Sequence, residues 1–194
     1  MRAWVAAVVI AGVLAGMPWP SAWAQTGGAC PPLGGLLTPA TVGTLVLRDG
    51  VGLGAVTLGS ASADVVRAWG PPTDCRPKGG GLYYGYELSD DGGQTSVLIL
   101  VDLYKDRVDQ IIVMLHTQSS RHGPAVRTGR GTGFFAPVSE VERAYGVPSV
   151  KAQVVWLYTA DGVGFQVSKQ FVAAILIYSP GGPPPDWNPS ERRQ

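Results

Sequence analysis

Acidic side chains are the residues whose number and spacing most directly suggest chemistry in this chain of 194 residues. Paired carboxylates can serve as acid and base in glycoside hydrolysis. Six acidic residues gather in one stretch: Glu87, Asp90, Asp91, Asp102, Asp106 and Asp109. Most of them fall in predicted turns, where Asp is common because its side chain bonds the local backbone. Solvated loops are therefore the simpler interpretation, and a hydrolase that uses Glu87 or Asp102 is the alternative.

The two histidines, His116 and His122, have no third potential ligand at a recognisable spacing. A zinc site normally needs three or four converging protein ligands. The sequence also lacks the nucleophile-elbow pattern of a Ser-His-Asp hydrolase. We therefore predict no metal, no cofactor and no catalytic residue, and we place the histidines at a strand end and in a linker.

Two glycine-rich runs invite comparison with phosphate-binding loops: Gly50-Val51-Gly52-Leu53-Gly54 and Gly129-Arg130-Gly131-Thr132-Gly133. Neither has the full dinucleotide-binding spacing, and neither is followed by a Lys-Ser/Thr pair. Each run occupies the same place in its half of the chain. Turn geometry is therefore the better interpretation.

Charge is balanced overall but unevenly distributed. Without a signal segment that contains Arg2, the chain has 14 basic and 14 acidic residues. This balance gives no argument for binding nucleic acid. Between positions 110 and 139 there is no acidic residue, while Arg121, Arg127 and Arg130 accumulate with both histidines. Opposed patches of this kind can steer and orient a partner.

The first 24 residues have the pattern of a secretory signal. Arg2 precedes an uncharged apolar run over 3–17, and Ala22-Trp23-Ala24 fits a small-x-small cleavage site. The run is shorter than the roughly 18–20 residues that a spanning helix needs. We expect an exported protein, periplasmic or extracellular, with no stable membrane insertion after cleavage.

Both cysteines, Cys30 and Cys75, follow the signal segment. Exported proteins normally use such cysteines in structural disulfides. We predict a bridge that pins the irregular segment 25–47 to the loop after the first helix.

The elements that position these residues occur twice. Trp69-Gly70-Pro71-Pro72 and Tyr145-Gly146-Val147-Pro148 lie 76 positions apart. We predict an α+β fold of two tandem repeats, 48–116 and 127–180, joined by a linker at 117–126 and followed by a disordered Pro-rich tail at 181–194. Each repeat is a short helix followed by a three-stranded antiparallel meander, and the two repeats pack together or share a sheet.

Local signals place the helices and strands. Ser60 is expected to cap the first helix, whose buried face is Val65 and Trp69. Pro137 starts the second helix. Gly70 and Gly146 end the two helices. Strands are expected over 82–88, 97–103 and 108–115, and then over 153–159, 164–168 and 171–178, with longer loops at 76–81 and 89–95.

Aromatic residues fall in corresponding first strands of the two repeats: Tyr83, Tyr84, Tyr86, Trp156 and Tyr158. Neighbouring strand positions point to opposite faces, so some of these side chains must face away from the helices. Core packing explains part of the pattern. An exposed aromatic sheet surface, of the kind that forms binding hot spots, is expected to explain the rest.

The pattern Leu58-Gly59-Ser60, Asp64-Val65 and Trp69-Gly70-Pro71-Pro72, followed by strands, resembles the small α+β repeat of β-lactamase inhibitory protein. It is also similar to the related outer-membrane assembly lipoprotein domain. The resemblance covers about residues 48–179 and implies a protein that acts by holding other proteins. The chain departs from the pattern in lacking the lipoprotein cysteine and in having Phe134-Phe135-Ala136 in its second unit.

These observations favour an exported, non-catalytic binding module that presents a sheet face to a protein partner. The alternative is an exported hydrolase or carbohydrate-binding protein that uses the carboxylates and tyrosines of the first repeat. A structural protein of the cell envelope is a third possibility.

Overall fold

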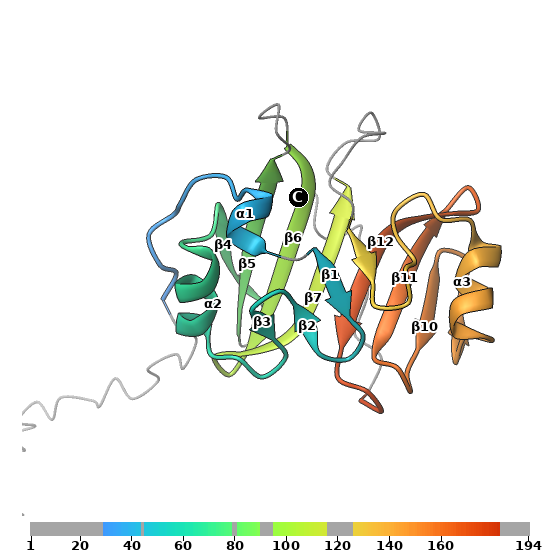
Figure 1. Cartoon of the computed structure of the whole chain (residues 1–194). Coiled ribbons are helices and arrows are strands. Elements are labelled where there is room, and N and C mark those ends of the chain that lie inside the picture. The colour runs from blue at the N-terminus through green and yellow to red at the C-terminus, as the bar shows by residue number, and fades with distance from the viewer. Residues whose placement is uncertain (1–28, 44, 79–80, 90–94, 116–125, 183–194) are drawn as a thin grey trace, which may run out of the picture.

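The computed structural model describes residues 29–43, 45–78, 81–89, 95–115 and 126–182 (Figure 1). The predicted signal peptide, most of the predicted linker and residues 183–194 of the predicted tail lie outside the described residues. So do His116, His122, Asp90, Asp91 and Arg121. Val126, the last residue of the predicted linker, is buried in the core.

An eight-stranded antiparallel sheet forms the centre of the fold. Its strands are β4 (Asp74–Lys78), β5 (Gly81–Ser89), β6 (Thr95–Tyr104), β7 (Arg107–Leu115), β9 (Val150–Lys151), β10 (Val155–Tyr158), β11 (Val163–Ser168) and β12 (Phe171–Tyr178). Their order in space is β4-β5-β6-β7-β12-β11-β10-β9. The α+β class is confirmed. The strands of both predicted repeats lie in this one sheet.

Each half of the sheet has four strands, where three were expected. Strand β4 covers part of the predicted loop 76–81 and pairs with β5, with Cys75 opposite Tyr84. Pro77 fits there because an edge strand can spare one backbone donor. At the other edge, β9 pairs with β10 over two residues. Neither edge strand is long enough to show a clear alternation of apolar and polar residues, so the sequence did not reveal them.

Two helices, α2 (Ser62–Trp69) and α3 (Val138–Tyr145), lie on one face of the large sheet (Figure 1). Within the described residues no helix is long and apolar enough to cross a membrane. The predicted buried face of α2 is confirmed, and Gly70 and Gly146 end the helices with φ of 82° and 79°. The predicted Ser60 cap is wrong: Ala61 is the N-cap residue, and the Ser60 hydroxyl bonds the Thr57 hydroxyl at 2.9 Å instead.

A small sheet and a short helix cover the same face between α2 and α3. Helix α1 (Pro39–Val42) precedes strands β1 (Val46–Arg48), β2 (Gly52–Leu53), β3 (Val56–Thr57) and β8 (Arg127–Thr128), which lie in the order β3-β2-β1-β8. The pairing of β1 with β8 is parallel and joins the two halves. Gly52 has φ of 153°, and a Cβ there would collide with the Val56 carbonyl oxygen. Gly50 and Gly54 lie in turns with φ of 63° and 56°, as the turn interpretation of the first glycine run predicts, whereas Gly52 lies in β2.

The same hydrogen bonds hold each helix against its strands. Tyr86 Oη donates to the Gly70 carbonyl oxygen at 3.2 Å. Tyr158 Oη donates to the Gly146 carbonyl oxygen at 3.3 Å. In both halves a tyrosine of the sheet thus donates a hydrogen bond to a carbonyl oxygen at the end of a helix, where no backbone N–H of the helix is available as a donor.

Cys30 and Cys75 form a disulfide with a Cα–Cα distance of 5.8 Å, as predicted. Cys75 lies in β4 and not in a loop, so the bridge ties the N-terminal segment to an edge strand. The segment is not irregular throughout, because it contains α1 and the buried Leu37. The disulfide agrees with an exported protein.

Removing this disulfide is expected to destabilise the fold by about 2–4 kcal/mol, because the bridge closes a long loop and restricts the unfolded chain. Urea unfolding of the wild type with and without dithiothreitol measures the effect. The double variant Cys30→Ala/Cys75→Ala is the control and should not respond to dithiothreitol. Equal stability of the oxidised and reduced wild type would contradict the prediction.

Candidate functional site

Four of the five predicted binding aromatics lie in the core. Tyr84, Tyr86, Trp156 and Tyr158 point toward the helices and are 0–7% exposed. Tyr86 packs edge-on against Trp69 at 5.4 Å between ring centroids, and Tyr158 lies 5.2 Å from Tyr145. Burial raises the pKa of Tyr158 to about 12. Core packing therefore explains these four, and among the five candidates the expected outward-facing aromatic is reduced to Tyr83.

Tyr83 lies on the opposite face, which we call the outer face, and it is half-buried. The pairing register shows which residues share this face. One row across the strands is formed by Glu87, Leu98, Met114, Ala174, Gln166 and Val155. A second row is formed by Gly85, Leu100, Ile112, Leu176, Gly164 and Leu157. The outer face thus spans both halves of the molecule.

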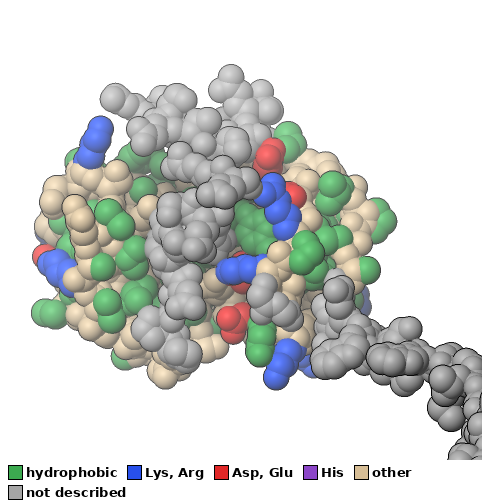
Figure 2. Space-filling view, turned by 180° about the vertical axis from the view of Figure 1, so that it is seen from behind, with side chains coloured by type: hydrophobic (Ala, Val, Ile, Leu, Met, Phe, Trp, Pro, Cys, Tyr) green, Lys and Arg blue, Asp and Glu red, His purple; other side chains and the backbone are tan. Residues whose placement is uncertain are grey.

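The second row is buried, whereas the first is partly open. Leu100, Ile112 and Leu176 are at most 1% exposed. Leu98, Met114 and Val155 pack against that buried row and are half-buried themselves. We call these three residues the apolar strip. Figure 2 views the molecule from this side and shows hydrophobic side chains on it beside charged ones.

A polar network lies on the outer face beside Tyr83. Lys78 Nζ lies 2.6 Å from Asp102 Oδ2, and the Gln110 amide donates to the same oxygen. Asp102 and Gln110 are each 5% exposed, while the Lys78 side chain is 48% exposed. Buried polar groups are stable only when they are hydrogen-bonded. The network therefore gives one end of the outer face a fixed polar character.

The carboxylates of this face are placed poorly for paired acid–base chemistry. Asp102 lies opposite Tyr83, and Glu87 lies four residues further along the Tyr83 strand. At about 3.3 Å per residue this separates them by roughly 13 Å. Paired glycosidase carboxylates lie about 5–9.5 Å apart. A hollow beside α1 and the small sheet is lined by residues such as Val42, Val46 and Arg48, and none of its described lining residues is acidic.

No group of three or more metal-ligating side chains occurs within the described part of the chain. Among the acidic residues singled out in the sequence, Asp106 accepts a hydrogen bond from Ser62 at the entrance of α2. Asp109 is exposed on β7.

A second polar cluster joins the two halves on the side of the helices. Tyr145 Oη of α3 donates to Asp49 Oδ2 at 2.9 Å, and Arg130 Nε lies 3.8 Å from the same oxygen. Arg130 also pairs with Asp161, and its guanidinium lies 4.5 Å from the centroid of the Tyr145 ring. The glycine-rich runs at 50–54 and 129–133 thus flank an ionic contact between the halves, which sequence analysis did not identify.

Burial raises the pKa of Asp49 above 3.8, although the Tyr145 hydrogen bond and the Arg130 charge act in the opposite direction. The folded state therefore favours the protonated carboxyl. Ionisation of Asp49 costs stability, and this cost develops as the pH rises from 3.8 through the raised pKa. Asp49→Asn removes this pH-dependent cost, so its stability relative to the wild type should increase as the pH rises from 3.8 through the raised pKa of Asp49, and should then stay constant at higher pH.

Urea unfolding of both proteins over this pH range measures the difference. Tyr145→Phe, which removes one donor to the buried carboxylate, should instead cost about 1–3 kcal/mol at neutral pH. Parallel pH profiles for the wild type and Asp49→Asn would contradict the assignment.

No known family model matches the chain, and none of the curated proteins matches it. An extracellular protein containing an SCP domain from Bacillus anthracis aligns at 10% identity and a TM-score of 0.37, over 63% of this chain and 44% of that chain. A cysteine-rich secretory protein from Staphylococcus aureus aligns at 13% identity and a TM-score of 0.39, over 69% of this chain and 50% of that chain. The chain spans about half the length of either structure. Likenesses at this level carry no argument about function.

Proposed function

We propose that this protein is an exported, non-catalytic binding module whose outer face holds a protein partner. The observation that carries the proposal is the asymmetry of the large sheet. Helices and the small sheet close one face, while the other bears the half-buried apolar strip of Leu98, Met114 and Val155. Apolar surface that is grouped on one face and rimmed by polar residues marks protein-binding sites.

The composition of the outer face favours a protein over a small molecule. The three residues of the strip lie on β6, β7 and β10, in a row that crosses six paired strands of a broad sheet. Small ligands bind instead in concave pockets. Met114 is at its middle, and methionine adapts readily to a partner's shape. The network of Lys78, Asp102 and Gln110 lies on the same face, beyond the buried row of Leu100 and Ile112, and supplies polar groups that can orient a partner.

We further propose that the two halves are copies of one α+β unit of the kind that the resemblance to β-lactamase inhibitory protein implies. The hydrogen bonds of Tyr86 to Gly70 and of Tyr158 to Gly146 support this proposal. So does the bond from the N–H of Gly70 to the Val66 carbonyl, which Gly146 and Glu142 repeat 76 residues later.

A comparison of three immobilised baits tests the binding proposal. Wild type, Met114→Arg and Val147→Arg are exposed to periplasmic extract and culture fluid. Met114→Arg places a charge in the apolar strip and should lose the partner or weaken its affinity about 30-fold, the equivalent of a hot spot worth about 2 kcal/mol. Val147 is 91% exposed outside the outer face, so Val147→Arg should bind like the wild type.

Thermal unfolding must show that Met114→Arg is folded. Retention of the same proteins by all three baits would contradict the assignment of the outer face, as would a loss of binding in Val147→Arg alone.

A further inference from the structure

The entrance to α3 differs from the entrance to α2 at one backbone position. The N–H of Gly59 donates to the Val108 carbonyl at 2.8 Å, and the N–H of Phe135 donates to the Val172 carbonyl at 2.9 Å. The two residues therefore occupy equivalent places. Both have positive φ, 80° at Gly59 and 60° at Phe135. Glycine adopts this conformation freely, whereas a bulky side chain does so only under strain.

The fold gains little from this strain. The Phe135 side chain is 43% exposed, while its neighbour Ala136 is buried. Among the described residues, the other non-glycine positions with positive φ are the central pairs of two hairpin turns, Lys105-Asp106 and Lys169-Gln170. Two-residue hairpins demand that geometry. A strained ring directed at solvent instead indicates a role in binding.

A second exposed aromatic lies beside Phe135. Phe171 is 48% exposed and bridges to Pro137, two residues after Phe135. The equivalent residue of the first half is Arg107, which bridges to Ala61 and donates to the Gly59 carbonyl at 3.0 Å. Two aromatic rings thus occupy the places that a glycine and an arginine occupy in the first half. We call Phe135 and Phe171 the aromatic pair.

The surroundings of the aromatic pair are basic. Lys169 is exposed in the hairpin that leads to Phe171, and Arg127 is exposed opposite Gly133. At the equivalent entrance to α2 in the first half, Asp106 accepts a hydrogen bond from the Ser62 hydroxyl. The corresponding hairpin residue near α3 is Gln170, whose carbonyl accepts from the N–H of Val138. Glu140, in the first turn of α3, is half-buried.

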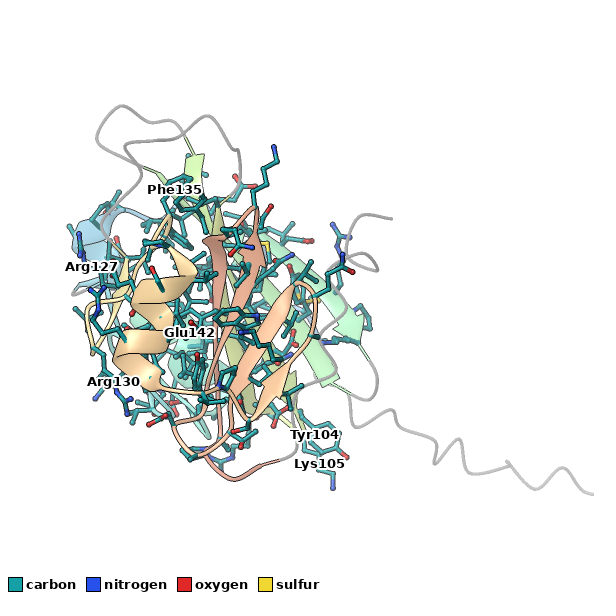
Figure 3. The ribbon with its side chains drawn as sticks, turned by 90° about the vertical axis from the view of Figure 1, so that its right-hand side faces the viewer. Tyr104, Lys105, Arg127, Arg130, Phe135 and Glu142 are labelled. Carbon is teal, nitrogen blue, oxygen red and sulfur yellow. A yellow bond between two sulfur atoms is a disulfide. The ribbon has the colours of Figure 1, made fainter. Side chains whose placement is uncertain are left out.

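We propose that the aromatic pair, flanked by Lys169 and Arg127, is a peripheral contact with an anionic lipid surface. Aromatic rings at an exposed tip can enter the headgroup region, while neighbouring Lys and Arg side chains meet anionic headgroups. Phe135 and Arg127 lie on one side of the molecule, and Tyr104 and Lys105 lie at the opposite end (Figure 3). The proposal concerns a lipid surface and not the protein partner, so it does not depend on the proposed function.

Sedimentation of the full chain with vesicles tests the proposal. One set contains equal parts of phosphatidylglycerol and phosphatidylcholine, and the other contains phosphatidylcholine alone. The wild type should bind the anionic vesicles more strongly, and less so at high salt. Phe135→Gly and Phe171→Ser should each weaken binding about tenfold or more, the effect of withdrawing one buried ring. Phe135→Gly should also melt at a higher temperature, because glycine relieves the strain.

Tyr104→Ser is the matched control, since it removes an aromatic that is 52% exposed at the other end of the molecule. It should bind vesicles like the wild type, as should Met114→Arg. Failure of the wild type to bind anionic vesicles would overturn the proposal, and so would unchanged binding by Phe135→Gly. Capture of a protein through Phe135 without any vesicle binding would overturn it in favour of a protein interface.

Discussion

The antiparallel pairing of β7 with β12 is the constraint on which the rest of the structure depends. It sets Ile111 opposite Ile177 and Val113 opposite Ile175 in the middle of the large sheet. Each strand belongs to a different half, so this single pairing fixes both helices on one face and makes the outer face continuous. Strands buried on both faces are apolar without alternation, which explains the unbroken apolar runs around Ile112 and Leu176.

The sequence predicts the structure well where local chemistry decides it. Val65 and Trp69 are one helical turn apart, which suffices to identify the buried face of α2. Gly70 and Gly146 supply the positive φ that ends each helix. Cys30 and Cys75 are the two cysteines of the chain. If the protein is exported, one intramolecular disulfide is therefore the simplest expectation. These features depend on few residues and little on distant ones.

Prediction fails where distant segments decide. Alternation along the strand places Tyr84 and Tyr86 on one face of the sheet and Tyr83 on the other. It cannot say which of the two faces the helices cover, because the central strands are apolar on both sides. The outer-face residues Leu98 and Met114 become recognisable only from the register of β6 against β7. Strands such as β1 and β8 are too short to show a period and are defined by their pairing with each other.

A binding surface that spans two halves is preorganised only if the halves move as one body. The β7–β12 pairing joins them within the large sheet. On the helix side, the β1–β8 pairing and the contact of Asp49 with Tyr145 and Arg130 join them a second time. Burying the Asp49 carboxyl opposes stability, and a carboxyl held at that cost is more easily explained by a need for alignment than by stability alone. The polar contact of Asp49 with Tyr145 and Arg130 thus adds a second connection between the two parts of the sheet.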